Sequence, residues 1–475
     1  MADTVHVVIL AGGAGERFWP ASQTARPKPF VDLFGEGTLF QEALRRAADL
    51  ARAEQTWVVG ARAHAPLLRA EATTRIPDSH ILLEPCRRDT APAAALAAAR
   101  IAALDPEAVL VLMPSDHHVP DRDAFRSTLL RAVAAARRGF LTCVGIPPVR
   151  PETRFGYVVA GCADVAPGVQ AAERFVEKPP LAEAQRLVAS GQAYWNAGLL
   201  ACRAADLCAA LRVHAPQIGA CLPDLATAGE AELEGLYPRL PAISLDYAVL
   251  QQAPNVAVAR ATFRWHDVGS WSELPFVSAD AAGNFVRGPV RLVNTRDSVV
   301  YNASDQPVVV HGLERLLVAQ VRDHVTLVAP LGGDTRQLLR ALETAGGVPE
   351  PRSGEALWAA IAAATPPADA GTGKATHDWG FRLTWARAPG YLARAVAVHA
   401  GAAVHWPCPT GWRDTYWCLS GEGRLGSATA DDPPLRAGLE VVVQAGEAFS
   451  LAAVSPVLLL QLRTAADAAG PAAPD

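Results

Sequence analysis

A glycine-rich string near the N-terminus has the composition of a phosphate-binding loop. It follows an apolar run, and its glycines let backbone N–H groups approach phosphate oxygens because no Cβ stands in the way. The arginine of the string can form a bidentate contact with a phosphate, and the lysine that follows supplies a mobile point charge. The residues concerned are Leu10, Ala11, Gly12, Gly13, Gly15, Arg17 and Lys28.

Two common nucleotide-binding motifs do not fit this string. A Walker A loop requires Gly-Lys-Ser/Thr, which is absent, and the spacing of Gly12 and Gly15 does not match G-x-G-x-x-G. Glycines also serve purely structural strand-to-helix turns, so the prediction depends on the whole string through Lys28.

A carboxylate stands at the end of a second apolar run. Asp116 closes the run Val109–Met113, and a carboxylate at the carboxyl end of a strand can hold a metal ion on a nucleotide. The alternative is a helix N-cap or turn residue. His117 and His118 follow, but adjacent residues on an extended chain point in opposite directions, so we interpret them as bystanders.

The use of lysine in this chain is unusual. Only Lys28, Lys178 and Lys374 are lysines among the 43 basic residues, which leaves 40 arginines. A retained lysine therefore points to a place that needs a compact ammonium. Glu177 and Lys178 follow a β-type run and offer an acceptor for hydroxyl groups and a cation for a phosphate, although such a pair is often solvated surface.

The first 282 residues alternate strand-like and helix-like segments, which predicts βαβ units in a mainly parallel sheet of an α/β domain. The expected strands are Val5–Leu10, Trp57–Gly60, Val109–Met113 and Cys143–Ile146, and the expected helices are Leu39–Ala53, Ala91–Leu104 and Ala124–Arg137. In such a sheet the ligand crevice lies at the carboxyl ends of the strands.

The rest of the chain has a different character. Residues 283–364 are expected to form a β-rich connector, either a solenoid or a meander, that ends in the helix-like pair Thr335–Glu343 and Gly354–Ala364. Residues 365–373 are expected to form a linker, and residues 374–475 a small β-barrel or sandwich.

Length and composition limit the number of domains, the kinds of partner and the location of the protein. At roughly 150 residues per domain, 475 residues predict two to four domains. A net charge of −5 argues against nucleic acid as a partner, and no run reaches the ~18 apolar residues of a membrane span. The N-terminus does not resemble a signal peptide, and eight scattered cysteines favour free thiols, so a cytoplasmic location is expected.

Eight ordered segments resemble the mannose-1-phosphate guanylyltransferases, of the type II mannose-6-phosphate isomerase/guanylyltransferase family. They are residues 10–28, 83–92, 113–117, 155–157, 175–179, 194–198, 244–248 and 265–271. The resemblance implies a Rossmann-like nucleotidyltransferase domain that forms GDP-mannose and pyrophosphate from GTP and mannose 1-phosphate, with Mg²⁺ as cofactor.

The resemblance also implies roles for individual residues. Asp116 and Asp267 would hold Mg²⁺, Arg17, Lys28 and Lys178 would act in catalysis, and Glu84 and Thr90 would contact the nucleotide together with the glycine string. The sugar phosphate would be bound by Gly156, Glu177, Lys178, Asn196 and Asp246.

Three positions depart from the family pattern. Asp89 replaces a usual Asn, Gln23 a common Arg and Pro29 a common Gln, so the choice of nucleotide and sugar is less securely implied than the chemistry. Two alternatives therefore stay open: a pyrophosphorylase for another pair of nucleoside triphosphate and hexose 1-phosphate, and a non-catalytic sugar-nucleotide sensor.

The last hundred residues resemble the family's cupin-type isomerase domain in framework only. Its expected cluster of metal ligands is replaced, and His405, Cys408 and Asp414 are the only local candidates, without a known ligand spacing. We therefore expect a degenerate cupin-like domain that has lost isomerase activity and serves dimerisation, regulation or stability, with a homodimer left open.

Overall fold

The computed structural model describes residues 4–13, 16–72, 75–321, 326–333, 373–388, 391–426 and 433–465. The chain divides into two compact units, Met1–Ala341 and Leu342–Asp475. The predicted helix pair at 335–343 and 354–364 and nearly all of the linker at 365–373 lie outside the described residues.

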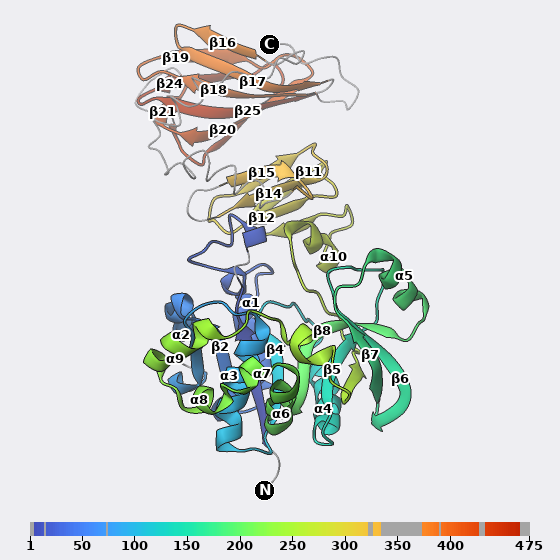
Figure 1. The fold of residues 1–475 in the computed structure, drawn as a ribbon. Coiled ribbons are helices and arrows are strands. Elements are labelled where there is room, and N and C mark those ends of the chain that lie inside the picture. The colour runs from blue at the N-terminus through green and yellow to red at the C-terminus, as the bar shows by residue number, and fades with distance from the viewer. Residues whose placement is uncertain are drawn as a thin grey trace. The chain divides into compact units, whose positions relative to one another are not determined.

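A nine-stranded sheet forms the framework of the first unit (Figure 1), in the order β3-β2-β1-β4-β8-β5-β9-β7-β6. Its strands are β1 (Val5–Ala11), β2 (Thr56–Ala61), β3 (Ile81–Glu84), β4 (Val109–Pro114), β5 (Leu141–Ile146), β6 (Tyr157–Ala166), β7 (Val169–Val176), β8 (Ala193–Arg203) and β9 (Val256–Arg260). The four strands β3-β2-β1-β4 are parallel, as are β5 and β9, which confirms the predicted α/β class. The long strand β8 runs antiparallel between β4 and β5.

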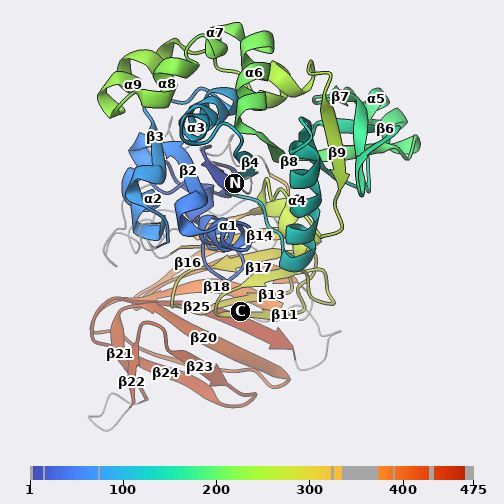
Figure 2. The ribbon, with the colours of Figure 1, turned by 90° about the horizontal axis from the view of Figure 1, so that it is seen from below.

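Helices cover both faces of this sheet. They are α1 (Leu39–Ala48), α2 (Ala65–Ala72), α3 (Thr90–Leu104), α4 (Arg122–Ala136), α5 (Leu181–Ala189), α6 (Ala204–His214), α7 (Pro216–Gly219), α8 (Leu222–Thr227), α9 (Glu230–Leu236) and α10 (Leu274–Val277). Figure 2 shows α3 and α6–α9 on one side of the sheet and α1 and α4 on the other. Successive side chains of a strand point to opposite faces of the sheet and so contribute to the hydrophobic cores on both faces. In β1, Val7 and Ile9 pack with the α1 and α4 side, whereas Val8 packs with the α3 side.

The β-rich connector within the first unit is built from parallel coils. Its strands are β10 (Phe285–Arg287), β11 (Val290–Val293), β12 (Val299–Asn302), β13 (Val308–His311), β14 (Leu316–Gln320) and β15 (Thr326–Pro330). β10, β12 and β14 pair in parallel, and so do β11 and β13, while only β15 pairs antiparallel. Successive parallel pairs require the chain to coil, so the arrangement is a short solenoid and not a meander.

The second unit consists of two antiparallel sheets with a shared core, the expected cupin-like arrangement. The six-stranded sheet contains β16 (Gly373–His377), β17 (Gly380–Ala388), β18 (Tyr391–Val398), β25 (Val457–Ala465), β20 (Trp412–Ser420) and β23 (Glu440–Val443) in this order. The four-stranded sheet contains β19 (Ala403–Pro407), β24 (Ala448–Ala453), β21 (Glu422–Leu425) and β22 (Pro434–Arg436). Aromatic side chains such as Trp406, Tyr416 and Phe449 fill the core between them.

All eight cysteines lie among the described residues as free thiols, and five of them are buried. Within the described part of the chain, none of the helices combines the length and the apolar composition that crossing a bilayer requires.

Candidate active site

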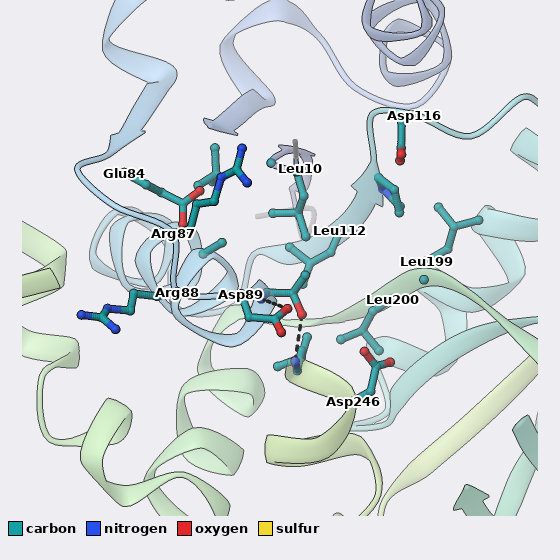
Figure 3. Close-up of a pocket in the computed structure, with 18 of the residues that line it drawn as sticks. Leu10, Glu84, Arg87, Arg88, Asp89, Leu112, Asp116, Leu199, Leu200 and Asp246 are labelled. Carbon is teal, nitrogen blue, oxygen red and sulfur yellow. Dashed lines mark hydrogen bonds between the residues drawn. The ribbon is translucent and has the colours of Figure 1, made fainter. Parts of the chain in front are cut away.

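Strand β1 carries the glycine string to the edge of a cavity of about 380 Å³ (Figure 3). Leu10 and Leu112, from the ends of the parallel strands β1 and β4, form part of its wall, as expected for a crevice at the carboxyl ends of strands. Gly12 and Gly13 line it, and Gly13 has a φ of +101°, a backbone conformation that favours glycine. Gly15 lies outside the described residues.

Lys28 holds two carboxylates together beside this cavity. Its Nζ lies 2.9 Å from Asp116 Oδ2 and 3.6 Å from Asp267 Oδ1, and its side chain is only 6% exposed. Burial raises the pKa of Asp116, but Lys28 and His117 lower it by more, to about 2. Asp116 is therefore ionised at every pH at which the protein is expected to work.

A short antiparallel bridge brings these sequence-distant aspartates together. The backbone N–H of His118 donates to the carbonyl of His266 at 3.0 Å, and His266 donates back to His118 at 3.1 Å. Asp267 directly follows His266 and Asp116 lies two residues before His118, so the bridge brings the two aspartates to the same place. The side chain of His118 turns away and packs against the ring of Phe34 at 4.0 Å between centroids.

His117 belongs to the carboxylate cluster, which the sequence interpretation did not anticipate. Trp265 Nε1 donates to His117 Nδ1 at 3.1 Å, so the remaining proton of the neutral ring lies on Nε2. This Nε2 is 4.0 Å from Asp267 Oδ1. Burial lowers the pKa of His117, although Asp267 and Asp116 oppose that shift, so the imidazole is neutral at pH 7. Its place beside the carboxylates follows from the contact of His117 with Trp265, a residue far away in sequence.

Asn196 and Asp246 form the opposite side of the cavity. Asn196 Nδ2 donates to Asp246 Oδ1 at 2.7 Å, and the Asn196 backbone N–H donates to the Gly156 carbonyl at 2.8 Å. Asp246 begins a π-helical turn, Asp246–Leu250. Burial, and after it the charge of Glu177, raises the pKa of Asp246 to about 6.

Glu177 and Lys178 lie beside this pair. Glu177 is 5% exposed and Lys178 51%, and Lys178 Nζ donates to Glu177 Oε1 at 2.5 Å. Burial lowers the pKa of Lys178, but the contact with Glu177 raises it by more, so the ammonium stays charged. Gly156 makes room for this arrangement, because a Cβ there would lie 2.4 Å from Glu177 Oε2.

A third side of the cavity carries the groups expected at the nucleotide. Tyr237 donates its hydroxyl to Glu84 Oε1 at 2.5 Å, and burial raises the pKa of Glu84 to about 7 against the effect of this hydrogen bond. Thr90 Oγ1 accepts from the Leu245 backbone N–H at 2.9 Å. Asp89 caps α3 by accepting from the Thr90 N–H at 2.7 Å, with a φ of +64° (Figure 3).

The cavity thus brings most of the predicted site residues together. Those that line it are Leu10, Gly12, Gly13, Glu84, Thr90, Asp116, Asn196 and Asp246. Lys28 and Asp267 adjoin it through Asp116, and Gly156, Glu177 and Lys178 adjoin it through Asn196 and Asp246. Arg17 is exposed and lies beside Gly269, outside the cavity wall, while Ala11 is buried.

Two arginines of the cavity wall, Arg87 and Arg88, were not singled out from the sequence. Arg88 donates to the Pro238 carbonyl, whereas Arg87 is exposed. Their position between Glu84 and Thr90 was the available signal, but arginine is so common in this chain that the two residues did not stand out.

The Asp116 and Asp267 carboxylates fit a magnesium ion that arrives with a nucleotide. Mg²⁺ commonly takes one or two carboxylates and completes its octahedron with water and phosphate oxygens. Among the described residues there is no group of three or more His, Cys, Asp or Glu side chains suited to a metal, so a dedicated protein cage is not formed there. The two aspartates instead match a site in which one or two carboxylates hold Mg²⁺ together with water and phosphate oxygens.

The three candidate metal ligands of the second unit are engaged separately. Asp414 is fully buried and paired with Arg463, with Nε–Oδ1 and Nη2–Oδ2 distances of 2.7 and 2.9 Å. Cys408 Sγ donates to the Trp412 carbonyl at 3.3 Å, and His405 Nδ1 lies 2.7 Å from Ser450 Oγ. The described geometry therefore does not bring them into one ligand set.

Comparison with known proteins agrees with this fold. Residues 6–283 match the family model described as nucleotidyl transferase, which defines the class of the protein. The chain is 34% identical over 376 residues to the xanthan biosynthesis protein XanB of Xanthomonas campestris pv. campestris, covering 75% of this chain and 76% of that protein.

Two further matches narrow the class. The mannose-1-phosphate guanylyltransferase of Escherichia coli K12 is 35% identical over 339 residues, covering 68% of this chain and 70% of that protein. A crystal structure described as mannose-1-phosphate geranyltransferase from Thermus thermophilus superposes with a TM-score of 0.65 at 36% identity, covering 72% of this chain and 99% of the other. The chain belongs to the mannose-1-phosphate guanylyltransferase family of nucleotidyl transferases.

Proposed function

We propose that the chain forms GDP-mannose and pyrophosphate from GTP and α-D-mannose 1-phosphate. A phosphate oxygen of mannose 1-phosphate attacks the α-phosphorus of GTP, the bond from that phosphorus to the bridging oxygen breaks, and pyrophosphate leaves with the electron pair. No covalent intermediate on the protein is needed. The protein's work is to align two polyanions and to neutralise the charge of the leaving group.

The observation that carries the proposal is the convergence of Lys28, Asp116 and Asp267 at a cavity that the glycine string and the Asn196–Asp246 pair also line. Such a site has donors and cations for a triphosphate on one side and polar groups for a sugar phosphate on the other. The names of the relatives support guanine and mannose as the specific partners.

Each group then has a task that follows from its chemistry. Gly12 and Gly13 would donate backbone N–H groups to phosphate oxygens, and Lys178 would bind the sugar phosphate while Glu177 accepts from sugar hydroxyls. Asp116 and Asp267 would hold Mg²⁺, which when bound offsets negative charge on the phosphates. Arg17 and Lys28 would add positive charge toward the triphosphate.

A pyrophosphate-release assay tests the substrate assignment. It should compare GTP with ATP, CTP and UTP, each with mannose 1-phosphate and glucose 1-phosphate. We expect GTP with mannose 1-phosphate to exceed every other pair in kcat/KM by on the order of 10-fold or more. A different preferred pair would show another pyrophosphorylase, and sugar-nucleotide binding without turnover with any pair would show a sensor.

We further propose that the second unit has lost isomerase activity. The pairing of Asp414 with Arg463 supports this, because both carboxylate oxygens of the fully buried Asp414 accept from the guanidinium and no open side is left for a cation, in contrast to the partly exposed Asp116. We expect the full chain to show no interconversion of mannose 6-phosphate and fructose 6-phosphate with added divalent metals. Metal-dependent interconversion above a no-enzyme control would contradict this. The free thiols support a reducing, cytoplasmic compartment.

A further inference from the structure

A separate cavity of about 410 Å³ lies on the other face of the nine-stranded sheet from the candidate active-site cavity. Neighbouring residues of β8 point to opposite faces, so Asn196 lines the active-site cavity, whereas Trp195 lines this one and packs with the core on the α1 and α4 side. The lining is mostly apolar. We call it the aromatic cavity, and its principal residues are Val149, Arg150, Phe155, Trp195, Trp265 and Phe276.

Three aromatic rings form the wall of this cavity. The Phe155 ring meets both Trp195 and Trp265 edge to face, with centroids 5.4 Å apart in each pair. Both indole N–H groups are engaged inside the protein, because Trp195 donates to the Tyr157 hydroxyl and Trp265 to His117 Nδ1, each at 3.1 Å. The wall therefore presents ring carbons without an indole donor, which suits a flat apolar group.

Two large apolar side chains stand at the mouth of the aromatic cavity. Val149 is 81% exposed and Phe276 73% exposed, although both line a concave and mainly apolar site. A concave apolar wall with exposed apolar side chains around it is typical of a binding site for a small molecule. A ligand in the cavity would remove part of this apolar surface from water.

Most charged groups of the lining already have close partners. Arg264 donates to both carboxylate oxygens of Asp121, at 3.0 and 2.9 Å. Glu273 accepts from Arg154 Nη1 at 2.8 Å, and Asp267 lies 3.6 Å from the buried lysine ammonium of the active site. These groups therefore have little capacity for a further charged partner.

Arg150 is the exception among these charged groups. Its guanidinium lies 5.7 Å from the centroid of the Trp195 ring, and its contact with Glu152 Oε2 is long, at 3.5 Å. The Glu152 carboxylate is already held by Arg154, through Nε at 3.0 Å and Nη2 at 3.1 Å. Arg150 thus places a weakly paired guanidinium beside the aromatic wall, where it can form a bidentate contact with a carboxylate.

The wall of the aromatic cavity is continuous with the predicted active-site residues. Phe155 precedes Gly156 in the sequence, Trp195 precedes Asn196, and Asp267 itself lines the aromatic cavity. A ligand that displaces this wall therefore moves groups of the active site from the other face of the sheet. Two distinct sites that share a wall in this way have the physical basis for a coupling free energy.

We propose that the aromatic cavity binds a small aromatic carboxylate and that the bound ligand alters turnover. The ring lies against Trp195 and Trp265, and the carboxylate binds Arg150. One weakly paired guanidinium matches the single negative charge of a carboxylate, and the ring carbons of the wall match a planar ring. Binding does not depend on the proposed transferase activity, whereas the effect on turnover rests on it.

The first test measures binding to the full chain by calorimetry with indole-3-acetate as the probe. Indole-3-acetamide keeps the ring and loses the charge, and acetate keeps the charge and loses the ring. We expect indole-3-acetate to bind more tightly than either by on the order of 10-fold or more. Absence of indole-3-acetate binding, or equal affinity for the amide or for acetate, would overturn the proposal.

Substitutions then locate the bound probe. Arg150→Gln and Phe276→Ser should each weaken indole-3-acetate binding by on the order of 10-fold, since one loses the charge-assisted contact and the other the apolar cover. Arg150→Lys keeps the charge without the fork, should bind with intermediate affinity, and decides the matter if Arg150→Gln does not fold. The matched controls are Arg212→Gln and Val213→Ser, exposed on α6 and expected to bind like the wild type. Unchanged affinity in the Arg150 and Phe276 variants would overturn the proposal.

The last test follows pyrophosphate release at several concentrations of indole-3-acetate. With both substrates saturating, we expect the probe to change kcat by on the order of 2-fold or more, and Arg150→Gln to keep its basal kcat but lose this response. A rise in the KM for one substrate alone would place the probe in the active-site cavity and overturn the proposal. Unchanged kinetics with the probe bound would overturn its regulatory part. A chain without transferase activity would contradict the proposed function, and the binding measurements would still decide whether the aromatic cavity takes the probe.

Discussion

Lys28 Nζ donates a 2.9 Å hydrogen bond to Asp116 Oδ2 at the carboxyl end of β4. The ammonium is almost fully buried, whereas the carboxylate is 31% exposed and borders the cavity. Lys28 contacts the buried side of the Asp116 carboxylate and keeps it ionised. The other side of the carboxylate stays open to a ligand in the cavity. Asp267 shares the same ammonium at 3.6 Å, so one cation positions both proposed metal ligands.

Replacing either aspartate should remove activity with little change in fold. We expect Asp116→Asn and Asp267→Asn to lower kcat by on the order of 10³-fold, because each keeps the side-chain volume but loses the charge that would hold Mg²⁺. Circular dichroism and the thermal midpoint check folding. Asp121→Asn is the matched control, since Asp121 pairs with Arg264 and is absent from the cavity wall. Near-normal turnover by the Asp116 or Asp267 variant would contradict the assignment.

Exchanging lysine for arginine should be harmful at two positions only. Lys28→Arg places a larger planar group in a buried space between two carboxylates, and Lys178→Arg alters a residue with a φ of +46° beside Glu177. We expect each to lower kcat/KM by on the order of 10-fold or more, measured by pyrophosphate release. Lys374→Arg, in the second unit, is the control. Wild-type kinetics for Lys28→Arg would show that the compact ammonium is not required.

The sequence predicted the elements that carry the site better than the contacts within it. The strands ending at Ala11 and Pro114 were recognisable because apolar β-type runs stop at polar or glycine residues. The position of β8 between β4 and β5 was not, since strand order depends on packing over a long sequence separation. The same holds for the His118–His266 bridge, which together with Lys28 brings Asp116 near Asp267.

Gly156 should be sensitive to a single added methyl group. A Cβ there would lie 2.4 Å from Glu177 Oε2 and 3.0 Å from the Phe175 ring, so Gly156→Ala must displace Glu177. We expect the KM for mannose 1-phosphate to rise by on the order of 10-fold, with a smaller change in the KM for GTP. Gly235→Ala, where a Cβ meets nothing within 4 Å, is the control. An equal rise in both KM values would argue against a sugar-side role.

The ionised carboxylate of Glu84 should lower the free energy of unfolding at high pH. Its pKa is raised from 4.5 to about 7, so the folded protein binds this proton more tightly than the unfolded chain does. The penalty is absent below pH 4.5, grows between pH 4.5 and 7, and is complete above pH 7. Glu84→Gln can still accept from Tyr237 and should raise the free energy of unfolding by up to about 3 kcal/mol above pH 7.

Denaturant unfolding at pH 5 and pH 8 measures this difference. The gain from Glu84→Gln should be larger at pH 8, whereas the exposed control Glu54→Gln should show no such dependence. A gain that is the same at both pH values would mean that burial of the charge is not its cause. A higher KM for GTP in Glu84→Gln would agree with the predicted contact between Glu84 and the nucleotide.

In the second unit the sequence showed that the expected metal-ligand pattern is absent. It did not show that an ion pair between Asp414 and Arg463 stands there instead. The interpretation of His405, Cys408 and Asp414 as poor ligands followed from their spacing. That Asp414 is fully buried and paired with Arg463 follows only from the register of β20 with β25, which no local pattern encodes.

The most direct test of the account is a single measurement of GDP-mannose formation. The full chain is incubated with GTP, mannose 1-phosphate and Mg²⁺, and products are resolved by chromatography. We predict GDP-mannose and pyrophosphate in equal amounts, abolished by excess chelator and by the double variant Asp116→Asn/Asp267→Asn. GDP-mannose formation that survives in the double variant, or its absence from the wild-type chain, would contradict the central claim.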